Sequence, residues 1–298
     1  MNKLLIIILA MLLVSFGKPF IDNPDGPEPI KESTALKKTE FRMATYNIRY
    51  RAKADVETGN AWEIRKKPLA DLILKSGFDI VATQEGDSTQ LQELKMLLPD
   101  FEYVGHPYGG KNHNLHNCAT YYRKSLFEVM DQGVFWFSET PDVPSIGWDA
   151  TDRRICYWTK FRAKDTGDEF FMFNVHFYWR LQEARAASGP LLVNKIKEIA
   201  GGVPTVVLGD FNSLPETEQI RNIKTVLKDA YEKTISPPQG ITNTAFSGGV
   251  FQGNPKARID YIFVSPHFTV SDYKVHSDTY ADDRYPSDHL PVSALLRF

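Results

Sequence analysis

Cysteine is scarce in this sequence. Cys118 and Cys156 are the only two cysteines among 298 residues, and they do not form a CxxC pair. Two cysteines are too few for a scaffold built on disulfides. Both lie in runs typical of strands, where we expect two buried free thiols. A cross-strand disulfide between them stays open for an exported protein.

Positive charge is not in excess either. The 37 Asp and Glu residues outnumber the 35 Lys and Arg residues, and the formal net charge is −2. Proteins that bind nucleic acid strongly and without sequence preference usually carry a basic surface, because neutralised phosphates supply most of the affinity. We therefore expect no strong nonspecific nucleic-acid binding, although the charge balance does not exclude a local basic groove.

Long apolar runs are absent apart from one near the N-terminus. Residues 4–14 form an unbroken apolar stretch of eleven residues, with Lys3 before it and Ser15 and Gly17 after it. Such a run is too short to cross about 30 Å of hydrocarbon as a helix, so we expect no transmembrane segment. It predicts a signal peptide over residues 1–17 and an exported protein, periplasmic or secreted.

The chain changes character at about residue 40. Residues 18–39 contain four prolines among polar residues, which is typical of a linker. Beyond them, strand and helix patterns continue to the end of the chain, and we assign residues 40–298 to one folded domain. No repeat of 20 to 50 residues interrupts it.

Alternating apolar patterns predict the fold class. Apolar spacing predicts helices over residues 62–76, 88–98 and 181–200. Short apolar runs predict strands over residues 43–46, 79–83, 101–104, 118–122, 127–134, 155–161, 170–176, 205–208, 259–264, 269–276 and 292–297. The mixture predicts an α/β (α+β) fold, a four-layered α/β sandwich in which two packed mixed β-sheets are flanked by helices.

The informative polar residues stand where apolar strands end. They are Asn47, Glu85, His176, Asp210, Asn212, Asp260, Asp288 and His289. Buried carboxylates and amides are costly unless they are paired or bound to metal, so this shared placement predicts a single polar cleft. Oxygen ligands with few cysteines favour Mg²⁺ or Mn²⁺ over a structural zinc ion.

Six short motifs in this order resemble a known superfamily. The motifs are Tyr46-Asn47-Ile48, Gln84-Glu85, Asn174-Val175-His176, Gly209-Asp210-Phe211-Asn212, Arg258-Ile259-Asp260-Tyr261-Ile262 and Ser287-Asp288-His289. Their order and spacing are similar to those of the endonuclease/exonuclease/phosphatase superfamily, which has the deoxyribonuclease I-like fold. The resemblance covers residues 41–298 and implies that residues 40–298 are a catalytic domain of a bacterial exported member.

The resemblance also implies a role for each position. It makes Glu85 the principal metal ligand, with Asn47 beside it. Asp210 orients or deprotonates the attacking water, and Asn212 holds a phosphate oxygen or the nucleophile. His289 contacts the scissile phosphate, with Asp260 or Asp288 fixing its tautomer or binding metal, and His176 binds the phosphate from the other side.

Some residues carry a second interpretation. Glu85 alone can cap the helix expected from residue 88, and Asp260 can pair with Arg258 or Arg154. Arg154 can reach a phosphate or form a surface ion pair. His113 and His116 are expected in a solvated loop on the substrate side. Many bacterial relatives follow the His176 motif with an Asp and a His. The Tyr178 and Trp179 found here instead offer a stacking surface for a substrate.

The function implied is a divalent-metal-dependent phosphoesterase, either a phosphodiesterase or a phosphomonoesterase, in which water attacks the phosphorus in line. Its substrate would be a small molecule, a nucleic acid or a lipid head group, and we expect a monomer. The alternatives are a nuclease acting on DNA or RNA, a sphingomyelinase-like phospholipase and a non-catalytic binding module that retains the fold. The fold alone does not separate them, because function resides in the site.

Overall fold

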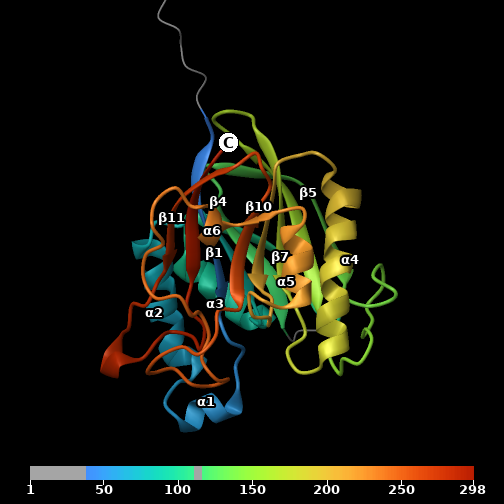
Figure 1. The fold of residues 1–298 in the computed structure, drawn as a ribbon. Coiled ribbons are helices and arrows are strands. Elements are labelled where there is room, and N and C mark those ends of the chain that lie inside the picture. The colour runs from blue at the N-terminus through green and yellow to red at the C-terminus, as the bar shows by residue number, and fades with distance from the viewer. Residues whose placement is uncertain (1–37, 111–115) are drawn as a thin grey trace, which may run out of the picture. The chain divides into compact units, whose positions relative to one another are not determined.

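The computed structural model describes residues 38–110 and 116–298. The predicted signal peptide, residues 18–37 of the predicted linker and His113 lie outside the described residues. The described strands form two six-stranded mixed sheets. This arrangement confirms the predicted α/β sandwich (Figure 1).

The first sheet has the strand order β11-β12-β1-β2-β4-β3. At its centre β1 runs parallel to β2 and antiparallel to β12. Its strands, in chain order, are β1 Glu40–Asn47, β2 Ile80–Gln84, β3 Phe101–Pro107, β4 Asn117–Arg123, β11 Thr269–Val275 and β12 Val292–Arg297.

The second sheet has the order β5-β6-β7-β8-β10-β9. Here β7 runs parallel to β8, and β10 runs antiparallel to β8. Its strands are β5 Phe127–Trp136, β6 Ile155–Ala163, β7 Glu169–His176, β8 Thr205–Asp210, β9 Lys228–Asp229 and β10 Asp260–Val264.

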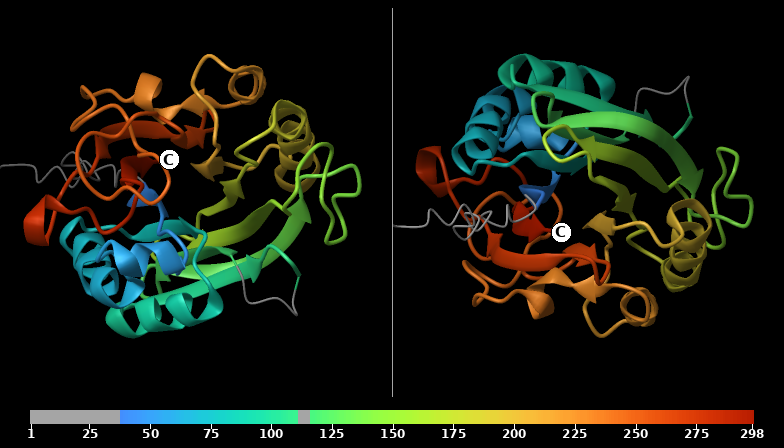
Figure 2. Two further views of the ribbon diagram at one scale, coloured as in Figure 1. Left: turned by 90° about the horizontal axis from the view of Figure 1, so that it is seen from below. Right: turned by 90° about the horizontal axis from the view of Figure 1, so that it is seen from above.

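The core lies between the sheets and under the helices. Alternate residues of the strands point inward, so Met43 and Ile80 of the first sheet pack with Met172 and Leu208 of the second in one apolar cluster. The other face of the first sheet is covered by α2 and α3, and that of the second by α4 and α5 (Figure 2). The described helices are α1 Lys53–Glu57, α2 Trp62–Lys75, α3 Ser88–Leu97, α4 Gln182–Ala200, α5 Glu218–Lys224, α6 Ala230–Lys233 and the short 3₁₀ helix Ala281–Asp283.

Local signals explain where these helices begin and end. The side chain of Asp87 accepts a hydrogen bond from the backbone N–H of Gln90, whose side chain in turn accepts one from Asp87 N–H, so a capping box begins α3. Glu85 is therefore not the cap of this helix. Gly77 follows α2 with a φ of +65°, the left-handed conformation that glycine adopts without strain.

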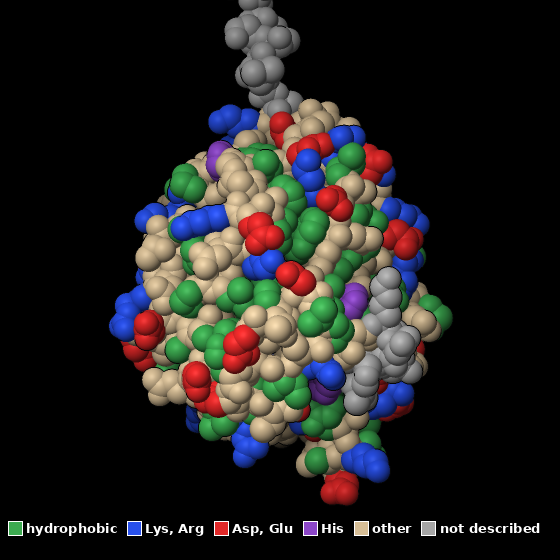
Figure 3. Space-filling view, turned by 90° about the vertical axis from the view of Figure 1, so that its right-hand side faces the viewer, with side chains coloured by type: hydrophobic (Ala, Val, Ile, Leu, Met, Phe, Trp, Pro, Cys, Tyr) green, Lys and Arg blue, Asp and Glu red, His purple; other side chains and the backbone are tan. Residues whose placement is uncertain are grey.

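The described residues contain no membrane-spanning helix, and the face drawn in Figure 3 shows no basic tract. Within residues 38–110 and 116–298, no helix combines the length and the apolar character needed to cross a bilayer. On the face drawn in Figure 3, Lys and Arg are interspersed with Asp and Glu. Cys118 and Cys156 are buried and free, which agrees with the expected thiols rather than a disulfide.

Candidate active site

The strand ends of the two sheets meet at one edge of the sandwich. In the first sheet Asn47 pairs with Gln84 at the ends of β1 and β2, and Glu85 follows directly. In the second sheet Asp210 lies opposite His176 on one side and Asp260 on the other. The Asn47 amide joins the sheets, because its Nδ2 donates to Glu85 Oε1 and to Asp210 Oδ2, both at 3.1 Å.

Backbone packing at this edge requires glycine before Asp210. Gly209 has a φ of +148°, and a Cβ atom there would lie 2.0 Å from the carbonyl oxygen of Val175. No side chain fits in that space, so the glycine permits β7 and β8 to approach and brings Asp210 level with His176.

Three non-glycine residues that follow strands at the site hold left-handed backbone conformations. The φ angles are +57° at Arg49, +72° at Glu85 and +46° at Asn212. Such conformations are disfavoured for residues with a Cβ atom and persist where the surroundings enforce them. Here they turn the chain sharply after β1, β2 and β8, and Glu85 and Asn212 thereby face the cavity.

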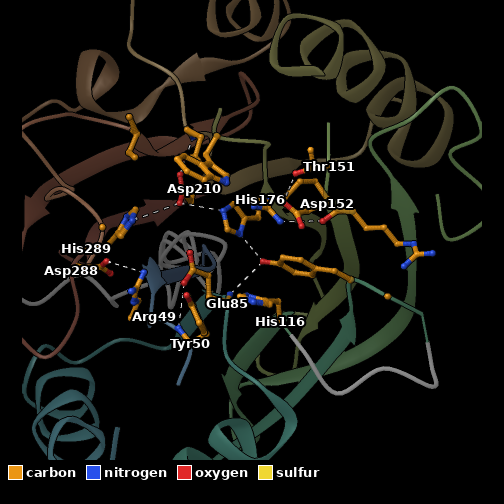
Figure 4. Close-up of a pocket in the computed structure, with 18 of the residues that line it drawn as sticks. Arg49, Tyr50, Glu85, His116, Thr151, Asp152, His176, Asp210, Asp288 and His289 are labelled. Carbon is orange, nitrogen blue, oxygen red and sulfur yellow. Dashed lines mark hydrogen bonds and ion pairs between the residues drawn. The ribbon is translucent and has the colours of Figure 1, made fainter. Parts of the chain in front are cut away.

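The edge opens into a cavity of about 760 Å³. Glu85, His176, Asp210, Asp288 and His289 line it, and Figure 4 shows their side chains converging. Asn212, Arg154 and Trp179 also line it, whereas Asn47 and Asp260 lie buried beneath it. Three predicted site residues are outside the cavity wall, and each bonds to a residue in it: Asn47 to Asp210, Asp260 to His289 and Tyr178 to Thr151.

His289 lies between two carboxylates. Its Nδ1 is 3.0 Å from Asp260 Oδ2, and its Nε2 is 3.8 Å from Asp210 Oδ2. Burial opposes the charged ring, but Asp260 and then Asp210 favour it, and the pKa of His289 is held well above its usual range. Asp260 therefore orients this ring, as one of the two expected carboxylates, and it does not pair with Arg258, which binds Asp229 instead.

Asp210 is suited to accept a proton near neutral pH. Burial raises its pKa to about 7, while the His289 cation beside it acts in the opposite direction. The backbone N–H of Asn212 donates to Asp210 Oδ1 at 2.9 Å and orients the carboxylate. A buried carboxylate poised near the working pH is the property expected of a general base.

Glu85 differs from Asp210 because its pKa is lowered and not raised. Burial opposes its ionisation, but His176, the Asn47 amide and His289 favour the carboxylate, and its pKa falls to about 2. Its Oε2 also accepts a bond from the backbone N–H of Tyr50 at 3.3 Å. Glu85 is therefore charged at all ordinary pH values, as a metal ligand must be.

The two histidines differ in charge. His176 is fully buried, and burial, assisted by the Arg154 cation, holds its pKa well below the usual value. Its Nε2 lies 3.4 Å from Asp210 Oδ2, and its Nδ1 lies 2.6 Å from the hydroxyl of Tyr108. At neutral pH the site thus holds a neutral His176 facing a cationic His289 across Asp210.

Asp288 points toward an arginine that sequence reasoning did not single out. Its Oδ2 accepts the backbone N–H of Gly249 at 2.8 Å and lies 3.5 Å from Arg49 Nη1. The same guanidinium forms two bonds to the buried Asp55. Asp288 is not part of the cluster that could hold a metal ion. Among the described residues, that cluster consists of Asp210, Asp260 and His289, whose ligand atoms all lie within 4.8 Å of one another.

Oxygen donors make the site suitable for a hard divalent cation. The cavity and its floor hold the carboxylates of Glu85, Asp210, Asp260 and Asp288; Arg49 pairs with Asp288, and His289 lies between Asp210 and Asp260. Clustered buried carboxylates are costly without a compensating positive charge. The residues present therefore fit Mg²⁺ or Mn²⁺ near Glu85, with oxygen as the ligand atom.

The residues expected to contact substrate are only partly accessible. Trp179 is 53% exposed and lines the cavity, so its ring is open to a ligand. Tyr178 is 1% exposed and its hydroxyl pairs with Thr151, which corrects the expectation of a stacking surface made by both residues. Arg154 lines the cavity, and its guanidinium lies 5.7 Å from the ring centres of Tyr108 and Tyr178.

The expectation for His116, a solvated loop on the substrate side, holds only in part, because the residue is half-buried. His116 lines the cavity, and its ring lies 4.8 Å from that of Tyr50 and 5.8 Å from that of Tyr108. Arg49, Tyr50 and Tyr108 were not predicted. Arg49 and Tyr50 directly follow the Asn47 motif, and this position is the signal that could have identified them; Tyr108 carried no such signal.

Comparison with known proteins agrees with this geometry. The family model described as "Endonuclease/Exonuclease/phosphatase family" matches residues 44–289. The chain belongs to this family. It is therefore a hydrolase of phosphoester bonds, which is the activity of the family's enzymes.

Three relatives illustrate the range of the family. A mannosyl-6-phosphatase structure from Bacteroides thetaiotaomicron is 38% identical with a TM-score of 0.81, over 87% of this chain and all of that chain (100%). An uncharacterized protein of Acanthamoeba polyphaga mimivirus is 26% identical over 78% of this chain and 90% of its own length. A CCR4-Not 3'-5'-exoribonuclease subunit of Candida albicans is 21% identical over 78% of this chain, and the match spans 37% of that protein.

Proposed function

We propose that the protein is a divalent-metal-dependent phosphomonoesterase that hydrolyses a sugar phosphate. The observation that carries the proposal is the composition of the cavity. One end gathers the ionisable residues Glu85, His176, Asp210 and His289, and the other end presents aromatic and hydrogen-bonding side chains around a space much larger than a phosphate group.

The ionisable end supplies the groups that phosphoester hydrolysis needs. Asp210, a carboxylate with a pKa of about 7, takes a proton from the attacking water. His289, cationic and oriented by Asp260, donates a proton or hydrogen bond to an oxygen of the phosphate or of the leaving group. His176 and the Asn212 side chain hold the remaining oxygens.

A divalent cation completes the charge balance. Glu85, with Asn47 beside it, would hold Mg²⁺ or Mn²⁺, which neutralises the negative charge of the phosphate oxygens. Asp288 is a weaker candidate ligand, because the Arg49 cation 3.5 Å from its Oδ2 already balances its charge, whereas the hydrogen-bond donors at Glu85 are neutral. We therefore assign Asp288 mainly to holding Arg49 in place.

The other end of the cavity fits a polyol ring. Trp179 presents an aromatic face, and Asp152 and Arg153 present hydrogen-bonding groups, whereas Tyr50 and His116 lie beside Glu85. Figure 4 shows Thr151 and Asp152 on the other side of the cavity from Asp288 and His289. Aromatic faces pack on the C–H faces of a ring while charged side chains bond its hydroxyl groups, and pockets of this mixed kind fix a ligand's orientation.

The similarity to known proteins supports a sugar phosphate over a nucleic acid as the substrate. The mannosyl-6-phosphatase, whose name specifies a sugar phosphate, is 38% identical across nearly the whole described domain. The exoribonuclease subunit, which acts on RNA, is 21% identical, and its match spans 37% of its length. The formal charge of −2 also lacks the basic excess of a protein that follows a nucleic-acid backbone.

A substrate series tests the proposal. The purified protein with Mg²⁺ or Mn²⁺ is assayed on mannose 6-phosphate, glucose 6-phosphate, p-nitrophenyl phosphate, bis(p-nitrophenyl) phosphate, single-stranded RNA and sphingomyelin vesicles. We expect the highest kcat/KM on a hexose phosphate and at least about a hundredfold less on the diester. Faster cleavage of the diester, RNA or sphingomyelin would reject the sugar phosphate and identify a phosphodiesterase, a nuclease or a phospholipase.

We also propose that the protein is exported and acts as a monomer. Support for export is the sequence of residues 1–17, with its basic start and its apolar run of eleven residues. Fractionation of the producing bacterium and N-terminal sequencing of the mature protein test this. Recovery in the cytoplasm with the N-terminus intact would contradict it.

A further inference from the structure

The two histidines of the site have partners of different chemistry on Nδ1. His289 faces the carboxylate of Asp260 at 3.0 Å, whereas His176 faces the phenol hydroxyl of Tyr108 at 2.6 Å. Tyr108 directly follows β3, is 4% exposed, and has no role in the chemistry described so far. A carboxylate stabilises a cationic ring, but a neutral phenol does not.

Counting donors settles the direction of the Tyr108–His176 bond. The phenol oxygen accepts the backbone N–H of Glu85 at 3.3 Å, and the Cys118 thiol donates to it at 3.9 Å. A backbone N–H cannot accept a proton in return, and a thiol is a weak acceptor. The phenol proton therefore goes to His176 Nδ1. Burial raises the pKa of Tyr108 well above its usual value, so this proton is retained.

This direction determines the state of His176. In a neutral imidazole one nitrogen donates and the other accepts, so an Nδ1 that accepts from Tyr108 leaves the proton on Nε2. Nε2 lies 3.4 Å from Asp210 Oδ2, and His176 lines the cavity. The opposite tautomer would direct a lone pair at the Asp210 carboxylate and at the phosphate oxygens.

We propose that Tyr108 is a positioning residue that locks His176 in the neutral tautomer with its proton on Nε2. The ring is then an obligatory hydrogen-bond donor toward Asp210 and the substrate phosphate, and it is not the acid of the reaction. That task falls to His289 alone. The part of this inference that concerns turnover rests on the proposed function, whereas the tautomer itself does not.

The position of Tyr108 is itself well supported. The indole Nε1 of Trp136 donates to the backbone carbonyl of Tyr108 at 2.7 Å, and Tyr108 N–H donates to the carbonyl of His116 at 2.8 Å. The phenol oxygen thus joins the backbone of Glu85 to the ring of His176 from a fixed point. Partners of this kind typically contribute about 10- to 100-fold to the activity or affinity of the group they orient.

The test is nitrogen NMR of the histidine rings combined with kinetics. In protein labelled with ¹⁵N-histidine, a His176→Gln sample identifies the His176 signals. We expect the wild-type ring at pH 7 to carry its proton on Nε2 with Nδ1 unprotonated. In Tyr108→Phe we expect a population protonated on Nδ1, a decrease in kcat of about 10- to 100-fold, and little change in KM.

Tyr121→Phe is the matched control. Its hydroxyl is also buried and donates one 2.7 Å bond, to the carbonyl of Leu91, outside the cavity wall. We expect Tyr121→Phe to lose some thermal stability, because a buried hydroxyl is lost, while kcat and the His176 spectrum stay unchanged.

If Tyr108→Phe also leaves kcat and the His176 spectrum unchanged, the inference is wrong. If Tyr108→Phe does not fold, the wild-type spectrum decides, since a proton on Nδ1 or on both nitrogens overturns the inference. A wild-type protein without turnover on any substrate would reject the proposed function and leave the spectral result standing.

Discussion

Replacement of Asp260 by asparagine removes the carboxylate that orients His289 without a large change of shape. Asp260 Oδ2 lies 3.0 Å from His289 Nδ1, and Asp260 is the first of the groups that raise the pKa of this ring. In Asp260→Asn the attraction between this carboxylate and the cationic ring is lost while burial still disfavours the cation, so the pKa of His289 falls. If the cationic ring is needed for turnover, activity is lost at a lower pH than in the wild type.

The size of the shift follows from the charges. Two opposite unit charges about 4 Å apart in a medium of effective dielectric constant about 20 interact by about 4 kcal/mol, which corresponds to about three pKa units. Asp210 remains with its Oδ2 3.8 Å from His289 Nε2 and retains part of the effect. We therefore expect the pKa of His289 to fall by about one to three units.

The assay is kcat/KM against pH for the preferred phosphoester, since this quantity reports the ionisations of the free enzyme. We expect the basic limb of the profile to move to lower pH by that amount. Asp272→Asn serves as control, because Asp272 pairs with Arg42 at the surface. A basic limb that keeps its wild-type position in Asp260→Asn would show that His289 is not the acid and would refute this reasoning.

Stability supplies a second check with a defined sign. The pKa of His289 is raised in the folded state, so the stability it contributes is present below its unfolded pKa of about 6.5 and is lost as pH rises through the higher folded pKa. The wild-type free energy of unfolding should therefore decrease from near neutral pH upward. In Asp260→Asn that decrease should be smaller.

Three further predictions concern the metal, the fold and the substrate. Glu85→Gln should weaken Mg²⁺ or Mn²⁺ binding, measured by calorimetry, by at least about tenfold while the protein stays folded, because the principal anionic ligand is lost; unchanged affinity would remove Glu85 from the metal site. Arg258→Met should lower the free energy of unfolding in urea by about 3–5 kcal/mol, because it leaves the buried Asp229 without its partner. As a control, Arg297→Met at the exposed pair with Glu40 should lower it by less than about 1 kcal/mol. Equal effects of the two substitutions would contradict a stabilising role for the buried pair. Trp179→Ala should raise KM for a hexose phosphate by up to about tenfold and leave inhibition by inorganic phosphate unchanged, because the indole contacts the ring and not the phosphate; a parallel loss of phosphate inhibition would place Trp179 at the other end of the cavity.

Much of the fold was predictable because its signals are local. The apolar strands and the spaced helices were visible in the sequence, and their alternation indicated two sheets with helices outside. The strand-end residues Asn47, Glu85, His176 and Asp210 came together for the same reason, since each follows its strand directly.

Contacts between loops and strands could not be predicted in this way. Tyr108 contacts His176 across 68 positions of sequence, and Arg49 meets Asp288 only after the distant strands β1 and β12 have paired in the first sheet. His116 was predicted in a solvated loop on the substrate side because its neighbours are polar; it lines the cavity but is half-buried, with the rings of Tyr50 and Tyr108 beside it. Tyr178 and Trp179 are adjacent and alike in type, yet one is buried and the other half-exposed.

The most direct test of the central claim is release of inorganic phosphate from mannose 6-phosphate, measured in Mg²⁺, in Mn²⁺ and in EDTA, for the wild type and for Asp210→Asn. The account predicts turnover that EDTA abolishes and added Mg²⁺ or Mn²⁺ restores. It also predicts that Asp210→Asn loses about 10²- to 10⁴-fold in kcat, as expected for a missing general base. Turnover that persists in EDTA, or an Asp210→Asn variant as active as the wild type, would contradict it.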